Sequence, residues 1–115
     1  MTPSEQAAAR AKMAEKFLRD AQHPENSLHT RYSCAFDALY LYALVAVQAP
    51  DGLKSHPYAK LLSDGAQLLQ LDMQAVDRLT LRMRKFGSQL EVTEEQVTEQ
   101  IGLATAARKA LQKDE

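Results

Sequence analysis

Apolar residues recur along most of this chain every three or four positions, which is the spacing of one face of an α-helix. The pattern predicts a first helix from about Pro3 to Ala21, with Met13 and Phe17 in its buried stripe. Residues Thr2 to Glu5 form a capping box that places proline at the first helical position. A polar turn is expected to follow.

The second helix is expected from Ser27 or Leu28 to Ala49, and it is the least amphipathic part of the chain. It carries two neighbouring apolar stripes, so it needs at least two neighbours. One stripe is Leu28, Tyr32, Ala35, Leu39, Tyr42 and Ala46, and the other is Phe36, Tyr40, Ala43 and Val47. This helix is therefore predicted to be the central helix of a bundle or half of a dimer seam.

Two shorter segments follow. The third helix is expected to start near Pro57, and Gly65 should weaken its middle. Its apolar face is Tyr58, Leu61, Leu62, Leu68 and Leu69. Asp72 can cap a fourth helix that ends at Gly87. The apolar residues of that helix are Val76, Leu79, Met83 and Phe86.

The last helix has the clearest start, because Thr93 and Gln96 are spaced as a capping box, with Val92 and Val97 as its hydrophobic staple. Its buried stripe is Val97, Ile101, Ala104, Ala107 and Leu111. The alternation of apolar and polar residues that is typical of strands is absent from the sequence. The sequence therefore predicts one all-α domain over residues 1–115, an up-and-down four-helix bundle with one additional short helix.

The composition narrows the class of protein further. The 115 residues are 45% hydrophobic and 25% charged, which excludes a disordered chain. Because the net charge is only −1, a nucleic-acid or membrane partner would need a local charged patch. The longest mostly apolar stretch, Ala35–Ala49, is too short and too polar to cross a bilayer, and no secretory signal is visible. We expect a cytoplasmic protein with no membrane partner.

Histidine and cysteine spacings favour neither metal binding nor nucleophilic catalysis. His23, His29 and His56 form no pair at a metal-ligand spacing. The only cysteine, Cys34, lies five residues after His29, which places the two on different faces of one helix. We expect Cys34 to be a small buried apolar residue, with a reactive thiol as the alternative. No metal, cofactor or catalytic residue is predicted.

A cluster of four cations lies on the fourth predicted helix, at Arg78, Arg82, Arg84 and Lys85. Arg78, Arg82 and Lys85 are spaced i, i+4 and i+7, so they share one helical face. Such a face could bind phosphate oxygens or an RNA backbone. The alternative is a solvated face whose charge is balanced by the acidic start of the last helix.

Asp37 interrupts the apolar run of the second helix, and a buried aspartate needs a partner. Arg31 is six residues away, on a different part of the helix surface, so a partner for Asp37 would come from another helix. Arg31 and Asp37 are our candidate buried polar residues. A solvent-facing position for Asp37 agrees equally well with the sequence.

The stretch Ser27–Leu39 resembles the second-helix signature of HEPN domains, in which a basic residue and an aromatic precede a short Ala-aromatic-Asp/Asn-Ala segment. Here these are Arg31-Tyr32 and Ala35-Phe36-Asp37-Ala38. The later order is also similar, because an arginine-rich helix, a linker and a final Ala-rich helix that opens at Thr93 follow one another. The resemblance covers roughly Leu28 to Leu111.

The resemblance implies a helical bundle that often forms a homodimer, and that pairs with a nucleotidyltransferase or acts in toxin–antitoxin and RNA-defence systems. Active members of the family are metal-independent ribonucleases, in which an arginine is followed by four to six residues and then a histidine. That motif is absent here, since no histidine follows His56. Only Arg82 or Arg84 can be carried over, as a phosphate-contacting residue.

We therefore expect a non-catalytic HEPN-like binding or interaction domain. The expected partners are a second copy of the chain, a nucleotidyltransferase-type or other protein, and RNA or a nucleotide. One alternative is a divergent ribonuclease toxin that uses Arg82, Arg84 and Tyr32. The other is a helical interaction scaffold with no role at nucleic acids.

Overall fold

The computed structural model describes residues 3–49, 59–86 and 91–113. Within these ranges the chain forms no strand and five helices: α1 (Pro3–Ala21), α2 (Leu28–Val47), α3 (Ala59–Leu68), α4 (Met73–Phe86) and α5 (Glu94–Lys113). The predicted all-α bundle is confirmed. The predicted bounds of α1 are also confirmed, whereas α2 ends two residues before Ala49 and the capping box at Thr2 lies outside the described residues.

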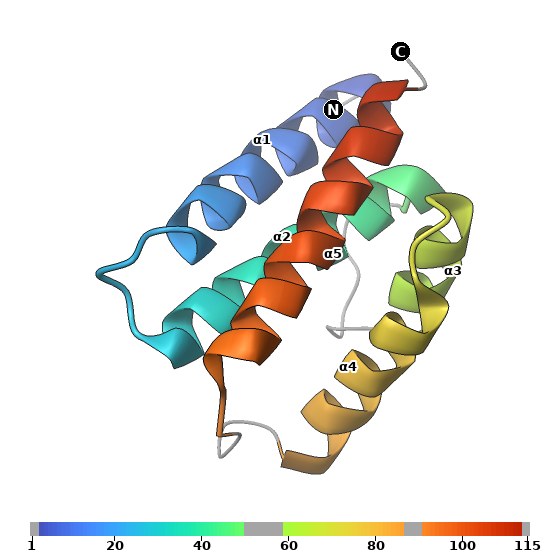
Figure 1. The fold of residues 1–115 in the computed structure, drawn as a ribbon. Helices are drawn as coiled ribbons and strands as arrows, with labels where there is room; N and C mark the ends of the chain where they lie inside the picture. Colours follow the sequence, from blue (N-terminus) through green and yellow to red (C-terminus); the bar gives the residue numbers. More distant parts are fainter. Residues whose placement is uncertain (1–2, 50–58, 87–90, 114–115) are drawn as a thin grey trace.

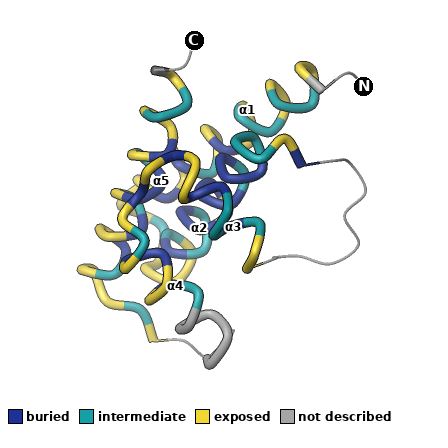
Figure 2. The backbone as a smooth tube through the Cα atoms, turned by 90° about the vertical axis from the view of Figure 1, so that its right-hand side faces the viewer, coloured by how far each residue is buried: buried dark blue, intermediate teal, exposed yellow. Residues whose placement is uncertain are grey.

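The second helix, α2, is the centre of the bundle. It contacts α1, α3 and α5, while α4 contacts α3 and α5 at the edge of the molecule (Figure 1). Buried positions gather around α2 in Figure 2. The central position predicted from its two apolar stripes is therefore confirmed. None of the described helices is long and apolar enough to span a membrane.

The crossing of α2 and α3 depends on Gly65. A Cβ added at Gly65 would lie 2.6 Å from the Cα, Cβ and O atoms of Ala43 on α2. Real Cβ atoms essentially never approach other heavy atoms so closely, so only glycine fits at this position. The prediction that Gly65 weakens the middle of α3 was incomplete, because the close approach of α3 to α2 requires a glycine at this position.

The predicted helix starts at Asp72 and Thr93 are confirmed by their hydrogen bonds. The Asp72 carboxylate accepts from the backbone N–H groups of Gln74 and Ala75, at 3.1 and 3.3 Å. Thr93 and Gln96 exchange two hydrogen bonds, at 3.0 and 3.2 Å, as a capping box does. These caps set where α4 and α5 begin.

Three residues of the predicted apolar stripes are exposed instead, and one of them is Leu28 at the first turn of α2, which is 37% exposed. Met13 is 50% exposed, because the contact of α1 with the bundle is made by the neighbouring Ala14 and Leu18. Leu68 is 63% exposed, because it lies at the last turn of α3, where Leu69 takes the buried position. Helical spacing predicts an apolar stripe, but the position of the neighbouring helix decides which edge of that stripe is covered.

Candidate functional site

All four predicted phosphate-binding residues lie on α4. Asp72 caps the start of this helix, and the buried side chains of Val76 and Leu79 hold it against the bundle. Arg78 lies between these two apolar residues and is exposed. The N-terminal half of α4 therefore has a buried side and a solvent-facing side, and Arg78 belongs to the second.

Arg78 has an acidic neighbour on α5. Its Nη2 lies 3.5 Å from Oε2 of Glu99, and both side chains are about half exposed. Exposed pairs of this kind contribute about 0–1 kcal/mol, so a competing anion can replace Glu99 at little cost. The pair also agrees with the alternative of a solvated face balanced by the last helix.

The side chains of Arg82, Arg84 and Lys85 lie outside the described residues. The backbone of α4 is helical through Phe86, so positions 82 and 85 stay in the register that places them on the same face as Arg78. Position 84 falls on a different face of this helix.

Arg31 and Asp37 are not brought together. The Nε of Arg31 donates a 2.8 Å hydrogen bond to the backbone oxygen of Ala21, at the end of α1. Arg31 is half-buried and ties the start of α2 to the end of α1, so its role is structural. Asp37 is exposed, although partial burial raises the pKa of its carboxyl. Its exposure favours the solvent-facing alternative.

Cys34 is half-buried, so it is less buried than the small buried apolar residue that the sequence predicted. Burial raises the pKa of its thiol, and the negative charges of Asp20 and Asp37 raise it further. A thiol with a raised pKa is protonated at neutral pH and is a weak nucleophile. These surroundings do not favour the reactive-thiol alternative.

Two polar groups in the core, the hydroxyl of Tyr42 and the side-chain amide of Gln100, were not expected from the sequence. Tyr42 and Gln100 are each 2% exposed, and no hydrogen-bond partner in the described structure reaches the Tyr42 hydroxyl or the Gln100 Nε2. Burial raises the pKa of Tyr42; the nearby carboxylate of Glu15 raises it further and Arg108 lowers it. Tyr42 gave no separate signal in the sequence because it lies in phase with the apolar stripe of α2.

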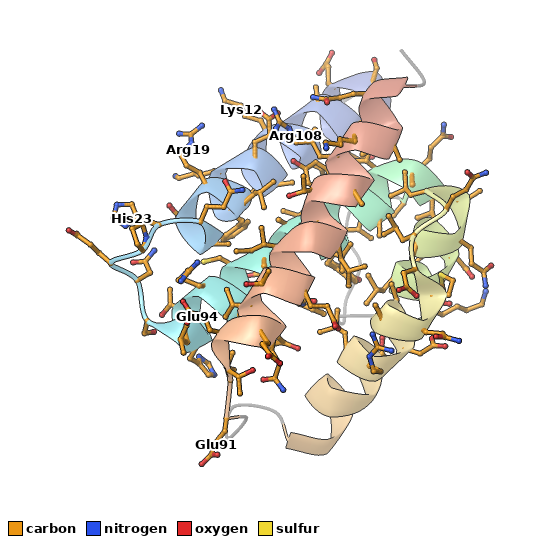
Figure 3. All side chains as sticks on the ribbon, viewed as in Figure 1. Lys12, Arg19, His23, Glu91, Glu94 and Arg108 are labelled. Atoms are coloured by element: carbon orange, nitrogen blue, oxygen red, sulfur yellow. The ribbon has the colours of Figure 1, made fainter. Side chains whose placement is uncertain are left out.

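Glu15 and Arg108 join α1 and α5 near Tyr42. The Nε of Arg108 donates to the Glu15 carboxylate at 3.2 Å, and Figure 3 places Arg108 where these two helices meet. Sequence reasoning could not find this pair, because its members are 93 residues apart. Both side chains are nearly half exposed, so the pair contributes little to stability.

Metal-binding chemistry finds no support among the described residues, where no group of three or more His, Cys, Asp or Glu side chains could hold an ion. His23 and His29 are exposed, and the Nδ1 of His23 accepts a 3.3 Å hydrogen bond from the backbone N–H of Glu25. His56 lies outside the described residues.

Comparisons with protein-family models, with curated proteins and with solved structures find no match to this chain. The resemblance to HEPN domains therefore stays a prediction from the residues of the second and fourth helices. What the chain binds has to be inferred from the chemistry of those residues.

Proposed function

We propose that this chain is a non-catalytic HEPN-like domain that binds RNA or a nucleotide on the exposed face of α4. The observation that supports this most strongly is the position of Arg78. It is exposed, it pairs with a half-exposed glutamate, and positions 82 and 85 share its face. Three cations on one helical face suit a row of phosphates.

We expect the exposed face of α4 to bind the phosphates of RNA without cleaving the RNA. Arginine stays protonated at neutral pH, so it donates hydrogen bonds but cannot take a proton from an attacking hydroxyl. RNA cleavage without a metal needs a general acid and base, and no histidine follows His56 in this chain. A phosphate that competes with Glu99 for Arg78 would be held and left intact.

An RNA-binding titration with matched double variants tests this proposal. Arg82→Gln with Lys85→Gln removes two charges from α4, whereas Lys12→Gln with Arg19→Gln removes two from α1, where both side chains project away from α4 (Figure 3). We expect the α4 variant to weaken binding to a labelled single-stranded RNA by roughly tenfold or more and to lower the salt slope by about two.

Two results would contradict the proposal. Equal weakening of RNA binding by both double variants would indicate non-specific electrostatic attraction. The absence of RNA binding at roughly 50 mM salt would exclude RNA as the ligand. The absence of RNA or nucleotide binding would favour the alternative of a helical interaction scaffold with no role at nucleic acids. The ion pair between Arg78 on α4 and Glu99 on α5 agrees with that alternative as well.

The resemblance also supports a homodimer and a protein partner of the nucleotidyltransferase type, in a toxin–antitoxin or related system. Co-expression with a nucleotidyltransferase from the same organism, followed by co-purification, tests the protein partner. Retention of the partner in high salt is the expected result, and separation of the two proteins in low salt would contradict it.

The alternative of a divergent ribonuclease loses one of its candidate residues. Tyr32 is 2% exposed in the core, so its hydroxyl cannot contact an RNA substrate without unfolding the start of α2. Arg82 and Arg84 remain for that alternative. We expect no RNA cleavage by the intact chain; cleavage that is lost in both Arg82→Ala and Arg84→Ala would instead identify a ribonuclease.

A further inference from the structure

A small polar pocket lies between α1 and α5. Its volume is about 170 Å³ and it is open to solvent; we call it the arginine pocket. Its lining residues are Glu15, Leu18, Arg19 and Gln22 of α1 and Arg108 of α5. The fold therefore brings two guanidinium groups to one concave surface, although the two arginines lie near opposite ends of the sequence.

The arginine pocket holds more hydrogen-bond donors than acceptors. Arg108 donates to the Glu15 carboxylate at 3.2 Å, whereas Arg19 has no ion-pair partner among the described residues. Each guanidinium carries five N–H donors and no acceptor, and the amide of Gln22 adds a further donor group. Since the lining holds a single carboxylate, an excess of one positive charge remains in the pocket.

The surroundings of the arginine pocket add to this positive charge. Lys12, Lys16 and Arg19 are spaced i, i+4 and i+7 on α1, so they share one helical face, and all three are exposed. Figure 3 shows the side chains of Lys12 and Arg19 on the same side of α1. Clustered charges of one sign raise the local concentration of small ions of the opposite sign.

A buried hydroxyl beside the Arg108–Glu15 pair has no hydrogen-bond partner in the described structure. It belongs to Tyr42, which is 2% exposed. Glu15 raises the pKa of this phenol and Arg108 lowers it, so both charged groups lie close to it. An anion that takes the place of Glu15 on Arg108 would release a carboxylate next to this unpaired hydroxyl.

We propose that the arginine pocket binds a phosphate group with two negative charges, either inorganic phosphate or the terminal phosphate of a nucleotide or RNA. The oxygens of such a group accept hydrogen bonds, and the forked guanidinium groups of Arg19 and Arg108 are suited to bind them. Because the Arg108–Glu15 pair is nearly half exposed, it is weak enough for a dianion to replace Glu15.

This site is separate from α4 and does not rest on the proposed function. A phosphodiester of the RNA backbone carries one charge and two ester substituents, so it fits a small pocket with two arginines less well than a terminal phosphate does. An RNA with a 5′-hydroxyl end lacks the terminal group. The RNA titration of the α4 variants, made with such an RNA, therefore stays independent of the arginine pocket.

A titration of the isotope-labelled full chain with inorganic phosphate, followed by NMR of its amides, tests the proposal. A parallel titration with sodium chloride at matched ionic strength separates phosphate binding from screening. We expect saturable shifts around Arg19 and Arg108, with a dissociation constant in the millimolar range. Shifts that chloride reproduces, or that do not saturate, would overturn the proposal.

Three variants distinguish a phosphate site from an ion pair that only joins two helices. Arg108→Gln should raise the dissociation constant for phosphate by at least about tenfold. Lys109→Gln removes the same charge one residue along α5, from a side chain that lines a different pocket, and should change the constant by less than about twofold. Glu15→Gln removes the competing carboxylate and should lower the constant by about threefold.

Two results from these variants would contradict the site. Equal weakening of phosphate binding by Arg108→Gln and Lys109→Gln would show that only general charge is at work. Unchanged or weaker binding in Glu15→Gln would show that Glu15 does not compete with phosphate for Arg108. Circular dichroism on each variant separates loss of binding from loss of the fold.

A comparison of two RNA ends identifies the source of the phosphate. The same short RNA is titrated with a 5′-phosphate and with a 5′-hydroxyl, into the wild type and into Arg108→Gln. Tighter binding of the phosphorylated RNA that is lost in Arg108→Gln would identify an RNA end as the ligand. Equal binding of the two RNAs, together with saturable binding of inorganic phosphate, would identify a free small phosphate.

Discussion

The inner and outer sides of α2 are built in different ways. On the inner side, Leu39 is fully buried and Ala43 lies against the backbone of α3 at Gly65. On the outer side, Asp37 is exposed and Leu41 is half-buried beside an open groove. One part of the circumference of α2 therefore packs in the core, while another part faces solvent.

The same division is present in α4. Val76 and Leu79 are buried, while Arg78 between them faces solvent and Glu99. In both helices the residues that could bind a partner project from a backbone held by packing on its opposite side. The comparison between inner and outer residues can therefore be tested by substitutions that are chemically identical but made on opposite sides.

The largest difference should come from two leucines on α2. Leu39→Ala leaves a cavity in the core and should lower the free energy of unfolding by about 3 kcal/mol. Leu41→Ala removes the same atoms from a half-exposed position and should cost about 1 kcal/mol. Urea unfolding of both variants at low protein concentration measures the difference. Equal losses would show that the two sides of α2 are packed alike.

The next effect should come from a pair of glycines. Gly65→Ala forces α3 away from Ala43 and should cost about 2 kcal/mol. Gly102→Ala on α5 is the control, since an added Cβ meets nothing within 4 Å, and it should stabilise the protein by about 0.5–1 kcal/mol. Thermal unfolding compares them. A stabilising Gly65→Ala would mean that the α2–α3 crossing is looser than described.

A smaller effect is expected at Tyr42, on the inner side. Its hydroxyl is buried with no hydrogen-bond partner in the described structure, and an unpaired buried hydroxyl destabilises a fold. Tyr42→Phe should therefore raise the free energy of unfolding by about 1 kcal/mol. Chemical unfolding of the variant measures this change. A decrease of similar size in the free energy of unfolding would show that the hydroxyl is hydrogen-bonded.

The smallest effect is expected at Asp37, on the outer side. Burial raises the pKa of this carboxyl above its ordinary 3.8, so the folded state holds the proton more tightly than the unfolded state does. The stabilisation is complete below the ordinary pKa and is lost as the pH rises through the raised pKa. At neutral pH, Asp37→Asn should therefore stabilise the monomer by about a few tenths of a kcal/mol, because the site is largely solvated.

A pH series of unfolding curves tests the Asp37 prediction. The gain from Asp37→Asn should disappear as the pH falls below the ordinary pKa of aspartate. Asp77→Asn, at an exposed position on α4, is the control for removing one surface carboxylate. A gain that grows toward acid pH would have the wrong sign and would contradict the stated cause.

Local sequence signals predicted the starts of α4 and α5 well. The caps at Asp72 and Thr93 act within three residues of themselves, so nothing distant changes them. The central position of α2 followed from its two apolar stripes. These features depend on helical spacing and on near neighbours in the chain, both of which are present in the sequence.

Contacts between distant segments could not be predicted in the same way. Helical spacing does not say that Gly65 meets Ala43, that Arg31 caps α1 or that Met13 is left at the edge of its stripe. The candidate site was predicted as a set of positions on α4, but the partner of Arg78 among several nearby glutamates depends on how α4 and α5 pack.

The most direct test of this account is amide hydrogen exchange on the isotope-labelled protein, with and without a short RNA. If α2 closes the core and α4 binds the ligand, residues 35–44 should exchange slowest, and added RNA should slow exchange mainly in α4. Exchange in α2 as fast as in α4, or RNA protection of α1 and α5 with α4 unchanged, would contradict the account.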